Sequence, residues 1–344
     1  MMKPTLKRIL LLCLAAIAVV AAFACFAAWR SLISSPFDID ETAYIYVRPD
    51  DSEENILSQL RETAHARTLS GWHIARAVIG FTPRTGRYAI EPGDGMLSVV
   101  RRIRNGQQTP IRLTIPSVRT LDRLAGFLSH KLMMDSVEVE GSFADSAFAA
   151  SYGYTVQTLP ALFIPNTYEL YWDISLESFM QRMKRENESF WQKDDRETLA
   201  KELHMTHEEV VTLASIVDEE TADNAEKPRV AGLYLNRLSQ GIPLQADPTV
   251  KFATGNPTLR RILNTHLHTE SPYNTYLHTG LPPGPIRIPS VAGIDAVLRH
   301  ETHDYIYMCA KEDFSGTHNF AVTYAEHQAN ARRYQKALNA RGIR

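Results

Sequence analysis

Three consecutive acids, Asp218, Glu219 and Glu220, end a predicted helix that is otherwise mostly apolar. Thr206 and Glu209 fit the Ser/Thr-x-x-Glu pattern of a capping box, which places the start of this helix at Thr206. Acids at a helix C-terminus oppose the helix dipole by roughly 0.3–1 kcal/mol each, so a simple surface helix seldom carries them there. A carboxyl group at the edge of an apolar face is partly desolvated, which keeps it protonated as a general acid requires.

The apolar residues of this helix decide where the three acids point. The buried stripe follows the i, i+3, i+4, i+7 spacing and consists of Val210, Leu213, Ala214 and Val217. At about 100° per residue, Glu219 is predicted to point to the solvent, while Asp218 and Glu220 flank the apolar face. The spacing does not choose between Asp218 and Glu220 as the acid, and a solvated acidic helix end is the alternative to both.

The elements that must position this helix fall into two predicted modules. Residues 42–106 show strand, helix, helix, strand and helix signals in that order, which predicts a small α+β unit. Residues 107–344 begin with a strand at 111–115 and a helix from 121, become mostly helical between Ser175 and about Gln240, and end in a helix near 324–338. The length of 344 residues fits two domains, and we expect an α+β protein whose second domain is a larger mixed α/β unit.

An uncharged run precedes both modules. Residues 9–29 contain no charged side chain, and 21 residues are enough to cross a hydrocarbon core as a helix. Lys3, Lys7 and Arg8 come before the run, so residues 1–8 are predicted to be a cytoplasmic tail, with the rest of the chain outside. A cleaved signal peptide is the alternative, although its apolar region usually spans only about 7–15 residues. We expect a retained single-pass anchor.

Composition and charge narrow the classes of partner. The formal net charge is −2, whereas a nucleic-acid-binding protein usually has a basic excess, so we expect no nucleic-acid partner. Three cysteines exclude a disulfide framework. His266, His268 and His278 cluster near Glu270, but without a His-Glu-x-x-His motif or paired Cys spacing they are interpreted as a polar loop. We therefore expect neither a metal site nor a cofactor.

A series of motifs runs in order through the second module. They are FIPNTY at 163–168, LASIVDEET at 213–221, YLNRL at 234–238, LQADPTV at 244–250, SPYNTY at 271–276, GLPPGPI at 280–286 and GTHNF at 316–320, followed by Glu326 and His327. Together these motifs resemble those of the MltG (YceG-like) endolytic murein transglycosylases. Pro116 and Ser117 replace a Glu-Gly pair of that family, so no family role is carried onto residues 114–120.

The resemblance implies a fold, a substrate and a reaction. Residues 42–106 are similar to the family's LysM-like subdomain, which implies glycan contact, and residues 107–344 are similar to its catalytic domain. The implied enzyme is a lyase that cleaves the MurNAc-β-1,4-GlcNAc bond of nascent peptidoglycan and leaves 1,6-anhydroMurNAc ends. The resemblance further implies peptidoglycan synthases as partners and a role in terminating glycan strands. With the anchor, the expected location is the cell (inner) membrane with the catalytic domain extracytoplasmic or periplasmic, and the sequence leaves open whether an outer membrane is present. A hydrolytic muramidase and a non-catalytic, membrane-anchored peptidoglycan-binding scaffold are the alternatives.

The resemblance also assigns site residues. The family's catalytic acid aligns with Glu220, with Asp218 as its rival on geometry alone. Further residues predicted to bind substrate lie in the downstream motifs, namely Gln245, Asp247, Asn274, Tyr276, His318 and Asn319. Each of them has a structural alternative as a turn or buried polar residue, and His318 and Asn319 have the alternative of holding the C-terminal fold together.

Overall fold

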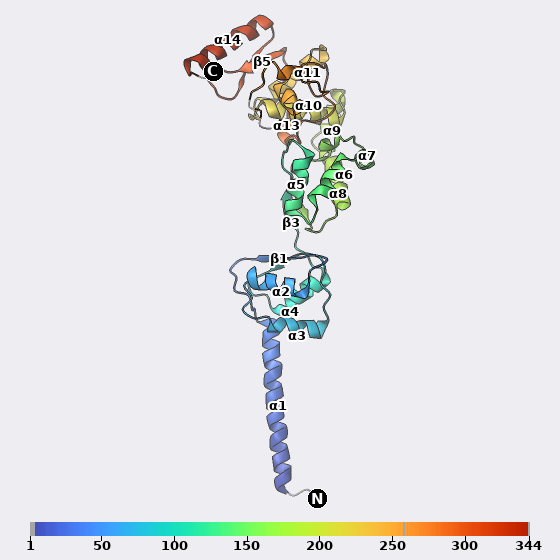
Figure 1. Ribbon diagram of the computed structural model, residues 1–344, viewed down its shortest axis with the longest axis vertical. Coiled ribbons are helices and arrows are strands. Elements are labelled where there is room, and N and C mark those ends of the chain that lie inside the picture. The colour runs from blue at the N-terminus through green and yellow to red at the C-terminus, as the bar shows by residue number, and fades with distance from the viewer. Residues whose placement is uncertain (1–3, 257–258, 260, 343–344) are drawn as a thin grey trace. The chain divides into compact units, whose positions relative to one another are not determined.

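The computed structural model describes residues 4–256, 259 and 261–342 and divides into two compact units. The first unit contains the chain up to Arg112 together with Glu169–Ile174, and the second contains Leu113–Tyr168 and the chain from Ser175 onward. Figure 1 follows the elements by colour along the chain. The protein is a mixed α+β protein, and its described residues form three sheets of two strands each.

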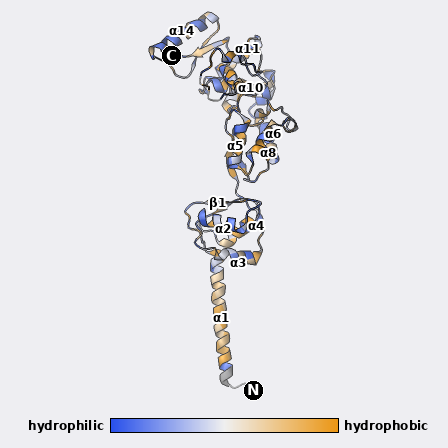
Figure 2. Cartoon of the chain, viewed as in Figure 1, coloured by the Kyte–Doolittle hydropathy of each residue, from blue (hydrophilic) through white to orange (hydrophobic). Residues whose placement is uncertain are grey.

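The first unit begins with an apolar helix, α1 (Pro4–Ile33). Within the described residues, Lys7–Ile33 is the one helical stretch long and apolar enough to cross a membrane, and none of it is buried inside the protein. In Figure 2 most of this helix is orange or pale, which marks its residues as mainly hydrophobic. The predicted span, residues 9–29, lies within this helix. Its Leu, Ile and Val side chains are exposed over this length, as in a helix that can cross a membrane.

The rest of the first unit has the predicted order of elements. Strand β1 (Ala43–Val47) pairs antiparallel with β2 (Gly86–Ile90), and helices α2 (Glu53–Glu62), α3 (Ser70–Ile79) and α4 (Met96–Asn105) complete the unit. Its core is a single apolar cluster that includes Ile45, Trp72 and Tyr88. Helix α4 ends at Gly106, whose φ of +67° suits a residue without a Cβ.

The second unit is mostly helical. Strand β3 (Ile111–Thr114) pairs with β4 (Thr167–Leu170), and each of these strands has two residues in either unit. Between and after these strands lie α5 (Leu121–Lys131), α6 (Ser136–Ala144), α7 (Ser146–Ser151), the 3₁₀ helix η1 (Leu159–Leu162), α8 (Leu176–Trp191), α9 (Arg196–Glu202), α10 (His207–Glu220), α11 (Lys227–Ser239), α12 (Asp247–Ala253), the 3₁₀ helix η2 (His266–His268) and α13 (Val291–Leu298). The antiparallel hairpin β5 (Tyr307–Ala310) and β6 (His318–Ala321) precedes the last helix, α14 (Tyr324–Ala340).

Helix α10 is the centre of the second unit. It begins with the predicted capping box, in which Glu209 N donates to Thr206 Oγ1 over 3.2 Å and Thr206 N donates to Glu209 Oε2 over 2.8 Å. All eight residues from Val210 to Val217 are buried, because α11, α13, α12 and η1 pack around the helix. A helix enclosed in this way is fixed along its length, and its last turn carries the three acids.

Candidate active site

Asp218 is enclosed by hydrogen-bond and ion-pair donors at the end of α10. Lys227 Nζ lies 2.7 Å from Asp218 Oδ1, and both side chains are less than a tenth exposed. Ser290 donates its backbone N–H to Oδ2 over 2.5 Å and its hydroxyl to Oδ1 over 3.0 Å. Every one of these contacts is a donor to a carboxylate. Asp218 therefore joins α10 to α11 and α13, and it has no open side from which to give a proton to a substrate.

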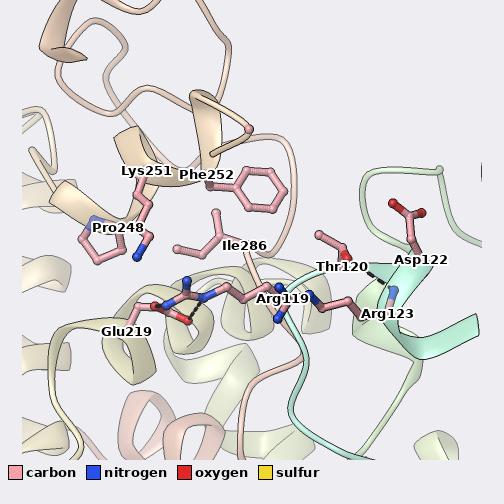
Figure 3. A pocket seen from close by; sticks show the side chains of 10 residues that line it. Arg119, Thr120, Asp122, Arg123, Glu219, Pro248, Lys251, Phe252 and Ile286 are labelled. Atoms are coloured by element: carbon pink, nitrogen blue, oxygen red, sulfur yellow. Dashed lines mark hydrogen bonds and ion pairs between the residues drawn. The ribbon is translucent and has the colours of Figure 1, made fainter. Parts of the chain in front are cut away.

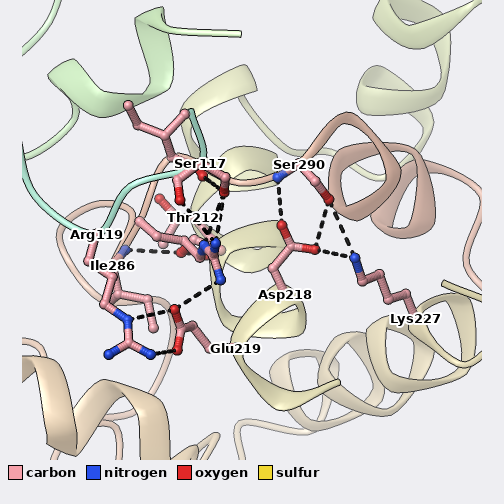
Figure 4. A network of polar contacts seen from close by, with 11 residues as sticks. Ser117, Arg119, Thr212, Asp218, Glu219, Lys227, Ile286 and Ser290 are labelled. Carbon is pink, nitrogen blue, oxygen red and sulfur yellow. Dashed lines mark hydrogen bonds and ion pairs between the residues drawn. The ribbon is translucent and has the colours of Figure 1, made fainter. Parts of the chain in front are cut away.

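The position of Glu219 contradicts the prediction that its side chain points to the solvent. Arg119 Nε and Nη2 lie 2.9 and 2.5 Å from its two carboxylate oxygens, and Arg287 Nη1 lies 3.0 Å from Oε1. The Glu219 side chain is only 9% exposed. The prediction is wrong because Arg119 lies against this side of the helix (Figure 4), and Arg287 also bonds to Glu219. Ser117 also receives bonds from Arg287, at 2.9 Å to its hydroxyl, and so supports the same cluster.

Glu220 differs from both neighbours because it has no cationic partner. Tyr234 Oη donates to Glu220 Oε1 over 2.6 Å, and no ion pair to Glu220 forms among the residues that the structure describes. Burial raises the pKa of Glu220 to about 7, with the charges of Asp247 and Glu219 adding to the rise and the Tyr234 bond opposing it. A carboxyl group with this pKa exchanges its proton near neutral pH, as a general acid and base must.

Two cavities meet at Glu220. One, of about 410 Å³, extends over Tyr234, Gln245 and Tyr276 toward the β5–β6 hairpin. The other, of about 900 Å³, extends past Lys251 toward α14. Glu220 and Asp247 line both cavities, and we call the two cavities together the cleft. Its many polar lining residues can bond to a ligand rich in hydroxyl and amide groups.

The wall of the cleft is held by hydrogen bonds between its own polar residues. Tyr276 Oη donates to Asp247 Oδ1 over 2.7 Å, and Arg237 Nη2 donates to Gln245 Oε1 over 2.6 Å. Gln245 has a φ of +52°, in the left-handed region that residues with a Cβ seldom adopt. Strained backbone of this kind is common where a side chain must be aimed at a ligand. Gln245, Asp247 and Tyr276 thus come together at the predicted place.

The predicted residue His318 also lines the first cavity. Its backbone N–H and its ring Nδ1 both contact Glu226, at 2.6 and 3.0 Å, and Glu226 is itself buried. A carboxylate bonded to Nδ1 fixes the orientation of the imidazole ring. The Glu226 contact therefore gives His318 a defined position beside the cleft.

Asn274 and Asn319 lie elsewhere. Asn274 is fully buried, donates its amide to the carbonyl oxygens of Leu267 and Thr269 at 2.9 Å each, and lines neither cavity of the cleft. We therefore assign Asn274 to the support of its loop and not to substrate contact. Asn319 Nδ2 donates to Glu312 over 2.7 Å and is likewise absent from both cavity walls, so it belongs to the C-terminal fold.

Several residues that shape the site have no role in the sequence analysis. Tyr234 and Arg237 are buried on one side of α11 and bond to Glu220 and Gln245 respectively. A tyrosine and an arginine three positions apart on one helix indicated such a role, because buried polar side chains need hydrogen-bond partners. Arg119 and Arg287 gave no such signal, since both lie in loops.

His266 and His268 of the predicted histidine cluster form the 3₁₀ helix η2. Among the residues that the structure describes, no three or more His, Cys, Asp and Glu side chains are grouped so that they could hold a metal ion. His266 Nδ1 instead accepts the backbone N–H of Leu263 over 3.0 Å, which stabilises the turn before η2.

Comparison with known proteins identifies a family and several relatives that this chain resembles in sequence. The family model described as the YceG-like family matches residues 45–333. An endolytic murein transglycosylase of Bacillus subtilis (strain 168) is 34% identical over 167 residues, which are 48% of this chain and 45% of that protein. The endolytic murein transglycosylase of Streptococcus pneumoniae (strain ATCC BAA-255 / R6) is 25% identical over 280 residues, 72% of this chain and 50% of that protein. The chain thus spans about half the length of these relatives.

A solved structure extends the comparison to three dimensions. The crystal structure of a yceG-like protein from Listeria monocytogenes superimposes with a TM-score of 0.56 at 25% sequence identity. The match covers 84% of this chain and 99% of the other. The similarity therefore includes most of the elements described above.

Proposed function

The chain belongs to the YceG-like family, and from that premise we propose that it is a peptidoglycan lytic transglycosylase whose catalytic residue is Glu220. The observation that carries the proposal is the carboxyl group of Glu220, whose pKa is raised to about 7 at the meeting point of two cavities. Its neighbours support the choice. Asp218 and Glu219 are bound to cations, whereas Glu220 has one hydrogen bond and an open cleft.

In the proposed reaction one carboxyl group serves twice. Protonated Glu220 gives its proton to the glycosidic oxygen as the bond from the muramic acid C1 to the GlcNAc O4 breaks. The 6-hydroxyl of the same muramic acid then attacks C1. Its proton passes to the carboxylate of Glu220, which restores the enzyme and leaves a 1,6-anhydromuramoyl end. The reaction consumes no water, and it requires no second carboxylate as a nucleophile.

The remaining cleft residues bind and orient the sugars in this proposal. Gln245 and Asp247 present amide and carboxylate groups to hydroxyl and acetamido groups, and Tyr276 adds a ring that can pack on a sugar face. His318 lies at the far side of the first cavity, held by Glu226. Good placement of the substrate contributes as much as the proton transfer, because reacting atoms must approach within about 3–3.5 Å.

A hydrolytic muramidase is the second candidate, and one observation favours it. Asp247 lines both cavities with Glu220, and its charge raises the pKa of Glu220. A second carboxylate in the cleft is what a hydrolase uses to activate water or to attack the sugar. The two reactions differ in their products, since hydrolysis leaves a reducing end. A non-catalytic scaffold needs no carboxyl group with a raised pKa and is the weaker alternative.

The test is product analysis with a matched pair of proteins. Full-length wild type and Glu220→Gln are incubated with uncrosslinked glycan strands, and the ends are identified by mass spectrometry. We expect 1,6-anhydro ends from the wild type and a rate lower by about 10²–10⁴-fold from the variant, the usual contribution of a general acid. Normal cleavage by Glu220→Gln rejects the assignment of the acid, and reducing ends from the wild type favour the muramidase.

We also propose where the enzyme works. Helix α1 anchors the chain in the inner membrane by a single span, with residues 1–8 in the cytoplasm and the catalytic unit in the periplasm; the basic residues Lys7 and Arg8 before the span support this orientation. The unit at 42–106 is proposed to be LysM-like and to contact glycan. Nascent strands beside the peptidoglycan synthases are then the substrate within reach, and their cleavage ends polymerisation.

A further inference from the structure

A third cavity, of about 420 Å³, opens beside the cleft. We call it the side pocket and define it by Arg119, Arg123, Glu219, Lys251, Phe252 and Ile286, which line it. Arg119, Glu219 and Lys251 also line the larger cavity at Glu220, so the side pocket is continuous with the cleft. A substituent on a sugar bound at Glu220 can therefore reach it.

The side pocket contains two cationic side chains without a partner. Arg119 is bound to Glu219, but the side chains of Arg123 and Lys251 form no hydrogen bond or ion pair with any residue that the structure describes. They come from two different elements, Arg123 from the first turn of α5 and Lys251 from α12 (Figure 3). Two unpaired cations in one cavity favour an anionic group between them.

The rest of the lining limits the kind of anion. Phe252 and Ile286 form an apolar wall, and Asp122 and Glu219 add two carboxylates. A compact diphosphate gains nothing from the apolar wall. A short peptide with free carboxylates, an amine and small apolar side chains matches all three kinds of lining.

We propose that the side pocket binds the acidic peptide stem of the muramic acid whose bond is cleaved, with Arg123 and Lys251 as the carboxylate ligands. The proposal rests on the proposed function, because the peptide reaches the pocket only when its sugar lies at Glu220. It makes the enzyme selective for strands that still carry their peptides. Strands from which an amidase has removed the peptides lose the contacts to Arg123 and Lys251 and bind less tightly.

The test compares two variants on two substrates. Arg123→Gln removes one cation of the side pocket, and Lys131→Gln makes the same change of charge at the exposed far end of α5, outside the pocket. Both are measured as full-length protein on peptide-bearing strands and on amidase-treated strands, all released from the lipid carrier. We expect Arg123→Gln to lower kcat/KM about tenfold on peptide-bearing strands, mainly through KM, because one charge-assisted bond is lost. We expect no change on peptide-free strands and none for Lys131→Gln.

Each other outcome has a distinct meaning. An equal loss on both substrates, or no loss on either while the wild type remains active, overturns the peptide proposal and leaves the catalytic one intact. In a third arm the same two variants are measured on strands still joined to the carrier diphosphate, and a loss seen in that arm alone also overturns the proposal, because the anion is then not the peptide. A wild type that cleaves neither substrate contradicts the proposed function itself.

Discussion

Glu219 and Glu220 are neighbours in the chain, but the structure surrounds them differently. On the clamped face of α10, defined by Glu219, Arg119 and Arg287, a carboxylate meets two guanidinium groups within 3.0 Å. On the cleft face, defined by Glu220, Tyr234 and Asp247, a carboxyl group meets one hydroxyl and a second acid. The first arrangement stabilises the negative charge of Glu219 and fixes the loops that carry the two arginines. The second places no cation beside Glu220, so that its carboxyl group keeps its proton.

The ion pairs on the clamped face lower the electrostatic cost of placing Glu220 on the cleft face without a cation. A helix that ends in three acids carries an electrostatic cost, and Asp218 and Glu219 lower that cost through Lys227 and the two arginines. Glu220 can then remain desolvated without a cation. Positioning and reactivity are thus divided between adjacent residues of one helical turn.

The largest expected effect that separates the two faces is the pH dependence of stability. The pKa of Glu220 is about 7 in the folded protein and about 4.3 in an unfolded chain, so between these values the folded state alone keeps the proton. The free energy of unfolding then decreases as the pH rises from about 4 to 7 and stays lower above, by up to about 3 kcal/mol. Glu220→Gln should remove this loss and be more stable than the wild type at pH 8.

Urea unfolding of both full-length proteins in detergent at pH 5 and pH 8 measures this difference. Other titrating groups affect the two proteins alike, so the difference between them isolates Glu220. If both proteins lose the same stability between the two pH values, Glu220 is not the desolvated acid that the cleft face requires.

A smaller effect is expected on the clamped face. Glu219→Gln leaves Arg119 and Arg287 without their shared anion and should lower the free energy of unfolding by about 1–2 kcal/mol, since the arginines are partly exposed and water screens them. The charge of Glu219 raises the pKa of Glu220, so its removal should move the alkaline limb of the rate profile to lower pH. Glu202→Gln, on the exposed end of α9, is the matched control and should change stability by less than about 0.5 kcal/mol. If Glu219→Gln lost as much activity as Glu220→Gln, Glu219 would have a direct role in catalysis.

Local chemistry explains which features could be predicted from the sequence. The capping box at Thr206 depends on residues within four positions of each other, and it was found where predicted. The order of elements in the first unit follows from apolar periodicity in the same way. Gln245, Asp247 and Tyr276 were identified by resemblance, and the structure brings them to one cleft wall.

The features that escaped prediction depend on contacts between distant residues. Arg119 and Arg287 reach Glu219 across 100 and 68 positions, and no helical periodicity contains such information. The same periodicity gave α10 one buried stripe, whereas all of Val210–Val217 is covered by other helices. Asn274 shows a limit of motifs. The motif at 271–276 identified Asn274 as a site residue, but a motif does not say whether a side chain contacts substrate or stabilises a loop, as the bonds of Asn274 to Leu267 and Thr269 do.

The smallest expected effect concerns the one hydrogen bond on the cleft face. The Tyr234 hydroxyl donates to Glu220 and so favours the carboxylate, which lowers the pKa of Glu220 against the effect of burial. Tyr234→Phe should therefore raise that pKa and move the alkaline limb of kcat/KM to higher pH, while the free energy of unfolding falls by only about 1 kcal/mol. The rate of the full-length protein on glycan strands, measured from pH 5 to pH 9, gives the position of the limb.

Tyr276→Phe is the matched control, because it removes a hydroxyl that donates to Asp247 instead of Glu220. Its rate should fall without a change in the pH of the limb, since the charge of Asp247 remains. A limb that moves in Tyr276→Phe and stays fixed in Tyr234→Phe would mean that Glu220 is not the titrating group. The contrast between the two faces of α10 would then no longer explain the reactivity.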